Sequence, residues 1–253
     1  MSKNTLLEIT IYPVKSCKGI CREEIAILPE GPDMDRRWMV VDMEGNFLSQ
    51  RKYPRLAMIH TGLDERNLFL SVPGQTPFML CREDGMEPCQ VQIWKRTHEA
   101  YDMGASVSKW LSTFLQTPCR LVFLPKDRPT SVTFVDRLPL LLLSENSLHE
   151  LNQRLNKRIR INRFRPNLVA STDRAFAEDS WKRIRIGDVT FRIEKPCVRC
   201  NVPCIDQETV KTDREPLEAL KTFRLQEGGI VFGQLLVPEN TGTISRGQEI
   251  HVL

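Results

Sequence analysis

The stretch Val189-Thr-Phe-Arg-Ile-Glu-Lys-Pro-Cys-Val-Arg-Cys200 begins with alternating apolar and polar residues. Alternation with a period of two puts every second side chain on one face, which predicts a β-strand with one buried face. Pro196 has no backbone N–H to donate to a neighbouring strand, so the strand is expected to stop there. The cysteine-rich segment 197–204 is then predicted as a loop at the end of a strand, a common place for binding and catalytic residues.

The same alternation recurs in both halves of the chain. Strands are predicted at residues 7–12, 38–42, 47–49, 68–72, 120–124, 167–171, 184–186, 231–237 and 249–253. The strands at 38–42 and 47–49 are expected to form a hairpin around Glu44-Gly-Asn46. Helical spacing predicts three helices, at 107–114, at 148–155 with Ser144 as its cap, and at 217–223 after Pro216. The predicted fold is mainly β with a few short helices, of the α+β class.

A chain of 253 residues has room for one large domain or two small ones. The segment 125–130 is polar and contains two prolines, which is typical of a junction between domains. We therefore expect one domain at residues 1–124 and a second at 125–253.

The composition excludes several classes of protein. The net charge of +4 is spread along the chain, which argues against a nucleic-acid-binding tail and favours small anionic ligands. No apolar run approaches the ~20 residues that span a bilayer, and the first residues do not resemble a secretory signal. The dispersed cysteines outside 197–204 are typical of reduced thiols inside a cell. We expect a cytoplasmic protein that binds neither nucleic acid nor membranes.

Cys197, Cys200 and Cys204 form the one cluster of thiols in the sequence. A thiol is a ligand or nucleophile only as the thiolate, which neighbouring cations such as Lys195 and Arg199 favour. Zinc and iron–sulfur sites need a fourth ligand, and no second cysteine pair or nearby histidine supplies one. Another soft-metal site, sulfur chemistry, or packing by one of the three thiols all remain open.

Cationic residues form a second group of candidates. Lys15 and Ser16 follow the first predicted strand, and Arg165 and Asn167 flank Pro166. Ammonium, guanidinium and hydroxyl groups at the ends of strands suit a phosphate, whereas the alternative is solvated turns with surface ion pairs. These segments are far apart in the sequence, so a single anion site requires the two halves of the chain to meet.

Taken together, these segments resemble the MOSC family, named after the C-terminal domain of molybdenum cofactor sulfurase, preceded by an N-terminal β-barrel domain. The ordered matches are Tyr12-Pro-Val-Lys-Ser-Cys-Lys-Gly19, Asp35-Arg-Arg-Trp38, Leu143-Ser-Glu-Asn-Ser-Leu148, Arg163-Phe-Arg-Pro-Asn167, Glu178-Asp-Ser-Trp181, Ile186-Gly-Asp188, Lys195-Pro-Cys-Val-Arg-Cys200 and Phe232-Gly-Gln234. The resemblance covers nearly the whole chain and extends to YcbX-like and amidoxime-reducing-component-like members. It implies a β-barrel-like domain at 1–124 and a MOSC β-barrel domain at 125–253.

The resemblance implies a molybdenum-dependent oxidoreductase that uses a molybdopterin-type cofactor to reduce small N-hydroxylated compounds to amines or amidines and water. Cys200 matches the protein ligand to molybdenum, and Asp206 either relays protons or is only a turn residue. Matches to the cofactor-binding segments, with lysine and arginine holding the pterin phosphate, are Lys15, Ser16, Arg36, Arg51, Ser144, Arg165, Asn167 and Arg199. Electrons are expected from a separate flavoprotein or ferredoxin-like donor, because the sequence has no flavin fold or complete iron–sulfur motif.

The chain also departs from the family pattern. Relatives commonly read Thr-Thr-Val-Asp-Pro-x-Thr-Gly after the ligand cysteine, whereas this chain has Pro203-Cys-Ile-Asp-Gln-Glu-Thr-Val210. Cys204 therefore adds a thiol whose role stays open. One alternative function is a sulfur-handling or cofactor-carrier protein with a persulfide on Cys200 or Cys204, and another is a structural metal-binding module.

Overall fold

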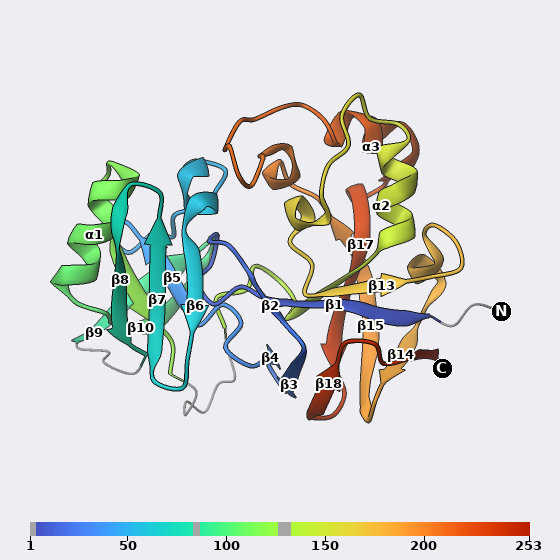
Figure 1. The fold of residues 1–253 in the computed structure, drawn as a ribbon, viewed down its shortest axis with the longest axis horizontal. Helices are drawn as coiled ribbons and strands as arrows, with labels where there is room; N and C mark the ends of the chain where they lie inside the picture. The colour runs from blue at the N-terminus through green and yellow to red at the C-terminus, as the bar shows by residue number, and fades with distance from the viewer. Residues whose placement is uncertain (1–3, 83–86, 126–132) are drawn as a thin grey trace.

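The computed structural model describes residues 4–82, 87–125 and 133–253 (Figure 1). Within these ranges the chain is mostly β-strand, which confirms the predicted class. The α-helices are α1 (Ala105–Leu115), α2 (Glu145–Asn152) and α3 (Leu217–Arg224). The single-turn helices are η1 (Pro54–Met58), η2 (Ile161–Phe164), η3 (Ala177–Ser180) and η4 (Val202–Cys204). No helix in these ranges combines the length and the apolar character that a bilayer crossing requires.

The largest sheet contains strands from both ends of the chain. Its hydrogen-bonding order is β19 (Ile250–Val252), β14 (Arg183–Ile186), β15 (Val189–Val198), β17 (Gly229–Pro238), β12 (Leu140–Ser144), β13 (Leu168–Ser171), β1 (Thr5–Ile11) and β2 (Ile20–Arg22), with β16 (Leu225–Gln226) beside β17. The N-terminal strand β1 therefore lies among strands of the second half, antiparallel to β13 (Figure 1).

Smaller sheets complete the fold. One of them has β3 (Glu24–Leu28) between β4 (Gly31–Pro32) and β18 (Gly242–Ser245). A second has the strand order β6 (His60–Leu63), β7 (Asn67–Val72), β8 (Gln75–Cys81). A third has the strand order β5 (Trp38–Val41), β11 (Arg120–Phe123), β10 (Arg96–Asp102), β9 (Glu87–Ile93). In the described part of the chain each sheet has an open hydrogen-bonding order. The closed barrels that the resemblance implied are not formed by these ladders.

Two large apolar cores support the fold, and the second also contains Leu6, Ile9 and Ile27 from the first half. Trp38, fully buried, stacks on Phe123 with 5.0 Å between ring centroids in the cluster that α1 covers. The second cluster lies inside the largest sheet, where Phe191 and Leu236 are fully buried. Burial of such side chains stabilises a fold by about 1.5–3 kcal/mol each. The two cores hold the loops between them in fixed positions.

Most local predictions are confirmed. The three helices lie at or next to the predicted positions, and Phe47 forms a bridge with Val41 as the expected hairpin requires. The predicted end of a strand at Pro196 is wrong, because β15 continues to Val198. Its register against β17 shifts on either side of Pro196, and such bulges let a strand pass a residue that lacks an N–H. Cys197 is thus in a strand and Cys200 in the loop after it.

The predicted junction at 125–130 lies outside the described residues apart from Pro125. The division at 124/125 therefore stays a prediction. Hydrogen bonds of β1 to β13 and of β3 to β18 join the first 28 residues to the second half.

Ser144 caps α2 and is fully buried. Its Oγ accepts hydrogen bonds from the N–H groups of Asn146 and Ser147, at 3.1 and 3.4 Å, and lies 2.7 Å from the hydroxyl of Thr172. The N–H of Ser144 donates to the buried carboxyl of Glu178, whose pKa is raised by burial. These contacts give Ser144 a structural role that does not depend on any ligand.

Replacing Ser144 by alanine is expected to lower the free energy of unfolding by about 1–2 kcal/mol, because the cap of α2 is lost. Thermal or urea unfolding of cofactor-free protein measures this change. Ser106→Ala, at an exposed position of α1, is the matched control and should change stability by less than about 0.5 kcal/mol. Unchanged stability of Ser144→Ala would contradict the capping role.

Candidate functional site

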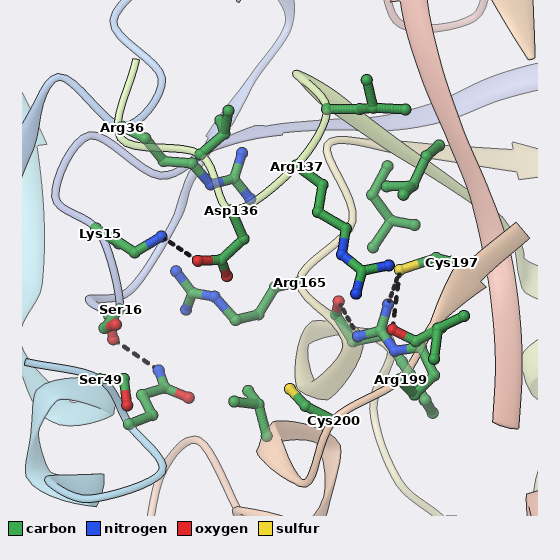
Figure 2. A pocket seen from close by; sticks show the side chains of 18 of the residues that line it. Lys15, Ser16, Arg36, Ser49, Asp136, Arg137, Arg165, Cys197, Arg199 and Cys200 are labelled. Atoms are coloured by element: carbon green, nitrogen blue, oxygen red, sulfur yellow. Dashed lines mark hydrogen bonds and ion pairs between the residues drawn. The ribbon is translucent and has the colours of Figure 1, made fainter. Parts of the chain in front are cut away.

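A cavity of about 460 Å³ lies between the loops of the two halves (Figure 2). It is lined by the cationic residues Lys15, Arg36, Arg51, Arg137, Arg165 and Arg199, by the carboxylate of Asp136, and by the thiols of Cys197 and Cys200. The fold has thus brought the Lys-Ser segment together with the Arg-Pro-Asn and cysteine segments, which come more than a hundred residues later in the sequence. Cations outnumber carboxylates on the walls, so the cavity attracts anions.

Lys15 provides a fixed ammonium at one end of the cavity. The residue is 6% exposed, and its Nζ donates to the carbonyl of Phe134 and to Asp136 Oδ1, both at 2.8 Å (Figure 2). Burial lowers the pKa of Lys15, and Asp136 opposes that effect by favouring the charged form. An ammonium has three protons to donate, so one remains for a ligand. Ser16 follows in a left-handed conformation, with a φ of 71°.

Two guanidinium groups share the ring of Tyr12. The Cζ atoms of Arg165 and Arg36 lie 4.2 and 5.0 Å from its centroid. Arg36 also donates to Asp35, whereas no described carboxylate forms an ion pair with Arg165. Burial lowers the pKa of Arg165, and the neighbouring charge of Arg36 adds to that effect. The Arg165 guanidinium therefore remains available for an anion in the cavity.

Asn167 lines the cavity, but its side-chain amide forms hydrogen bonds with the protein itself. Its Oδ1 accepts from the N–H of Leu141 at 3.2 Å and from Arg36 Nη1 at 3.3 Å. Its Nδ2 donates to the carbonyl of Thr10 at 3.1 Å and to Asp35 Oδ1 at 3.2 Å. A side-chain amide offers two donors and two acceptor positions, so none is left over. Asn167 positions Arg36 and is 1% exposed.

The two thiols at the other end of the cavity have different surroundings. Arg199 Nη1 donates to Cys197 Sγ at 3.1 Å, while its Nη2 donates to the carbonyl of Phe164 at 2.8 Å (Figure 2). Arg199 was expected to favour the thiolate of the metal ligand, but its hydrogen bond goes to Cys197 and not to Cys200. Cys200 is exposed and accepts no hydrogen bond from the described residues. Its sulfur is free to bind a soft metal from the cavity.

Three other candidates lie away from the cavity walls: Ser144, Asp206 and Cys204. Cys204 is buried, its Sγ donates to the carbonyl of Arg214 at 3.4 Å, and burial raises the pKa of its thiol. Within the described ranges, no three His, Cys, Asp or Glu side chains are grouped as a metal site would need. Ser144 is the helix cap described above.

Asp206 is fixed by its own turn. Its Oδ2 accepts from Arg163 Nη2 at 2.7 Å, and its Oδ1 accepts from the N–H groups of Glu208 and Thr209 at 3.1 and 2.8 Å. Burial alone would raise the pKa of Asp206, but these hydrogen bonds outweigh it and lower the pKa to about 2. A carboxyl that stays ionised at neutral pH is poorly suited to relay protons.

Sequence reasoning missed three features of the site. Asp136 and Trp94 line the cavity, and the Nε1 of Trp94 donates to Asp136 Oδ1 at 3.0 Å. Gln50 and Gln207, both buried, exchange two hydrogen bonds of 3.0 Å and join the loop beside Arg51 to the segment after Cys200. No local pattern marks these residues, because their partners lie between 42 and 157 positions away.

Comparisons with known proteins identify the family to which this chain belongs. Residues 3–118 match the model of the MOSC N-terminal beta barrel domain, and residues 129–251 match that of the MOSC domain. Mitochondrial amidoxime-reducing component 1 of Mus musculus is 36% identical over 98% of this chain and 82% of the relative, and that of Homo sapiens is 35% identical over 98% and 83%. Molybdenum cofactor sulfurase of Oryza sativa subsp. japonica is 32% identical over 91% of this chain, which spans 32% of that protein. The chain belongs to the family of MOSC-domain proteins that includes the mitochondrial amidoxime-reducing components.

Proposed function

We propose that the protein is a molybdenum-cofactor-dependent reductase of N-hydroxylated compounds. The observation that supports this most directly is a cavity lined both by the Cys200 thiol, which accepts no hydrogen bond from the described residues, and by the Arg165 guanidinium, which forms no ion pair with a described carboxylate. The near full-length similarity to amidoxime-reducing components identifies the class of substrate.

The residues present fit a molybdopterin-type cofactor. A dianionic phosphate needs cations and N–H donors, and Lys15, Arg36 and Arg165 supply them at one end of the cavity. A molybdenum ion needs a soft ligand, which Cys200 supplies at the other. When bound, the cofactor supplies the two-electron redox chemistry, which no side chain in the cavity can perform alone.

The overall reaction consumes one N-hydroxylated molecule, two electrons and two protons, and it releases an amine or amidine and one water. The nitrogen–oxygen bond is broken and the nitrogen is reduced. The electrons come from a separate donor, for which we retain the proposal of a flavoprotein or ferredoxin-like protein. The cytoplasmic location expected from the dispersed cysteines likewise remains a proposal.

The chain's own residues hold and orient the reactants. Cys200 fixes the metal, while Lys15 and Arg165 hold the phosphate and Asn167 keeps Arg36 in position. Burial lowers the pKa of Lys15, and the carboxylate of Asp136 opposes this effect by favouring the charged form. Gln50, which lines the cavity, is held in place by the two buried hydrogen bonds that it exchanges with Gln207. This arrangement places positive charge where the cofactor is negative.

A second candidate function is sulfur handling, in which Cys200 carries a persulfide and no substrate is reduced. It is favoured by the similarity to a molybdenum cofactor sulfurase and by the exposure of the Cys200 thiol. Sulfur released from purified protein by cyanide, in the absence of molybdenum, would support this function over the reductase.

Replacing Cys200 by alanine is expected to lower amidoxime reduction more than ~100-fold, because loss of a direct ligand exceeds the 10–100-fold effect of groups around it. Turnover of benzamidoxime with a chemical electron donor measures the change. Cys21→Ala removes another exposed thiol outside the cavity and should keep full activity. Full activity of Cys200→Ala would refute the ligand assignment.

Replacing Arg165 by alanine should reduce cofactor affinity about 10- to 100-fold, because a charge-assisted hydrogen bond contributes about 1.5–3 kcal/mol. Molybdenum and pterin content per protein is the measurement. Arg165→Lys keeps the charge and should retain more cofactor, and Arg158→Ala, an exposed residue outside the cavity, serves as the control. Equal cofactor content in Arg165→Ala and the wild type would contradict the phosphate clamp.

Replacing Asp206 by asparagine should leave the shape of the pH–rate profile unchanged between pH 5 and 9, because a pKa of about 2 keeps the carboxylate ionised throughout. Because that pKa is below the ordinary value of about 3.9, the carboxylate stabilises the fold at neutral pH. This stabilisation is lost as the pH falls from about 4 through about 2, and Asp206→Asn should not show it. A pH–rate inflection that disappears in the variant would instead support a proton relay.

A further inference from the structure

Trp94 is unlike the other three tryptophans. Half of Trp94 is exposed, whereas Trp38, Trp110 and Trp181 are 0%, 9% and 7% exposed. The exposed ring lies on the wall of the cavity, together with Phe47 and Arg51. A large apolar side chain that is left open to solvent on a cavity wall is typical of a surface that contacts a ligand.

The backbone at Trp94 is held in a conformation that bulky residues rarely adopt. Its φ is 56°, in the tight turn where Ile93 of β9 pairs with Arg96 of β10. Glycine or asparagine is preferred at such a position, and a side chain with a Cβ is disfavoured there. Since the ring is not part of the buried core, folding alone does not account for a tryptophan at this position. Strain of this kind is concentrated at binding sites.

Several contacts keep the indole in one orientation. Its Nε1 donates to Asp136 Oδ1 at 3.0 Å, and its ring meets Phe47 edge-on, with 5.2 Å between centroids and an interplanar angle of 62°. The Arg51 Cζ lies 4.5 Å from the ring centroid. Gln92 Nε2 also donates to the carbonyl of Trp94 at 2.9 Å. A ring that is already ordered loses little entropy when a ligand stacks on it.

The same carboxylate of Asp136 accepts from Lys15 and from Trp94. The indole is therefore tied to the ammonium that we assign to the cofactor phosphate. Its distance from that group is fixed by one side chain, and it lines the same cavity as Cys197 and Cys200.

We propose that Trp94 is a stacking surface for the planar, conjugated part of the substrate and sets a preference for aryl and heteroaryl N-hydroxylated compounds over aliphatic ones. The proposal rests on the proposed function and deepens it. Aromatic side chains prefer offset-stacked or edge-on contacts with other rings, and small aliphatic groups cannot form these contacts.

Fluorescence of the holoenzyme tests the contact directly. Benzamidine, a planar analogue of the reaction product, should quench the tryptophan emission of wild-type protein in a saturable manner. Trp94→Leu should abolish the quenching, whereas Trp110→Phe, which removes a buried tryptophan outside the cavity, should keep it. Quenching that persists unchanged in Trp94→Leu would overturn the proposal.

Kinetics test the selectivity. For Trp94→Ala, the ratio of kcat/KM for benzamidoxime to that for acetamidoxime should fall about tenfold through a rise in the benzamidoxime KM, as loss of one stacked ring implies. Trp94→Phe keeps a ring and should retain most of the ratio. Equal losses for both substrates would show a merely structural role and refute the proposal.

Molybdenum content distinguishes stacking of Trp94 on the substrate from stacking on the pterin of the cofactor. If Trp94 stacks on the pterin instead, Trp94→Ala loses molybdenum, and this outcome also overturns the proposal. If wild-type holoenzyme reduces neither amidoxime, the proposed function fails. A reductase that handles both substrates with the same ratio in wild type and Trp94→Ala would refute only the role of Trp94.

Discussion

The site depends on the side-chain amide of Asn167, which joins three segments of the chain. Its four hydrogen bonds reach Thr10 of β1, Leu141 of β12 and the Asp35–Arg36 pair. Inside a protein an unsatisfied polar group costs about 1–3 kcal/mol, so each partner depends on the others. The buried Asp35 carboxyl, whose pKa is raised by burial, accepts from Asn167 and also from the N–H of Tyr12 and from Arg36. The position of Arg36 in the cavity follows from this network.

Charge in the cavity is divided between two roles. Arg36 is neutralised by Asp35, and Arg199 is occupied by Cys197 and by the carbonyl of Phe164. The guanidinium of Arg165 lies over the ring of Tyr12 and forms no ion pair with a described carboxylate. The phenol of Tyr12 donates to the carbonyl of Pro166 at 3.0 Å, and burial raises its pKa to about 12, so it stays neutral. Arg36 and Arg199 therefore serve the framework, whereas Arg165 is left for an anion.

Local pattern predicted most of the fold and part of the site. Period-two alternation located β7, β14 and β17, and helical spacing with Ser144 as the cap located α2, because these signals depend on neighbours in sequence. The end of β15 was predicted wrongly because the bulges that let β15 continue past Pro196 depend on its pairing with β17, a strand more than thirty residues further along the chain. Asp136 and Trp94 could not be found, since their roles arise only where the two halves meet. The resemblance to the MOSC family supplied the metal, which no pattern of residues could name.

Placement of β1 in the largest sheet, between β13 and the edge strand β2, has a consequence for how the protein is made. Ile9 pairs with Leu168, so the first strand leaves the ribosome long before its partner β13 does. At about 5–20 residues per second, the interval is roughly 8–30 seconds. During it the edge of β1 has no partner from β13, and unpaired strands of this kind attract other chains. Chaperone binding to the nascent N-terminus would protect the chain during this delay.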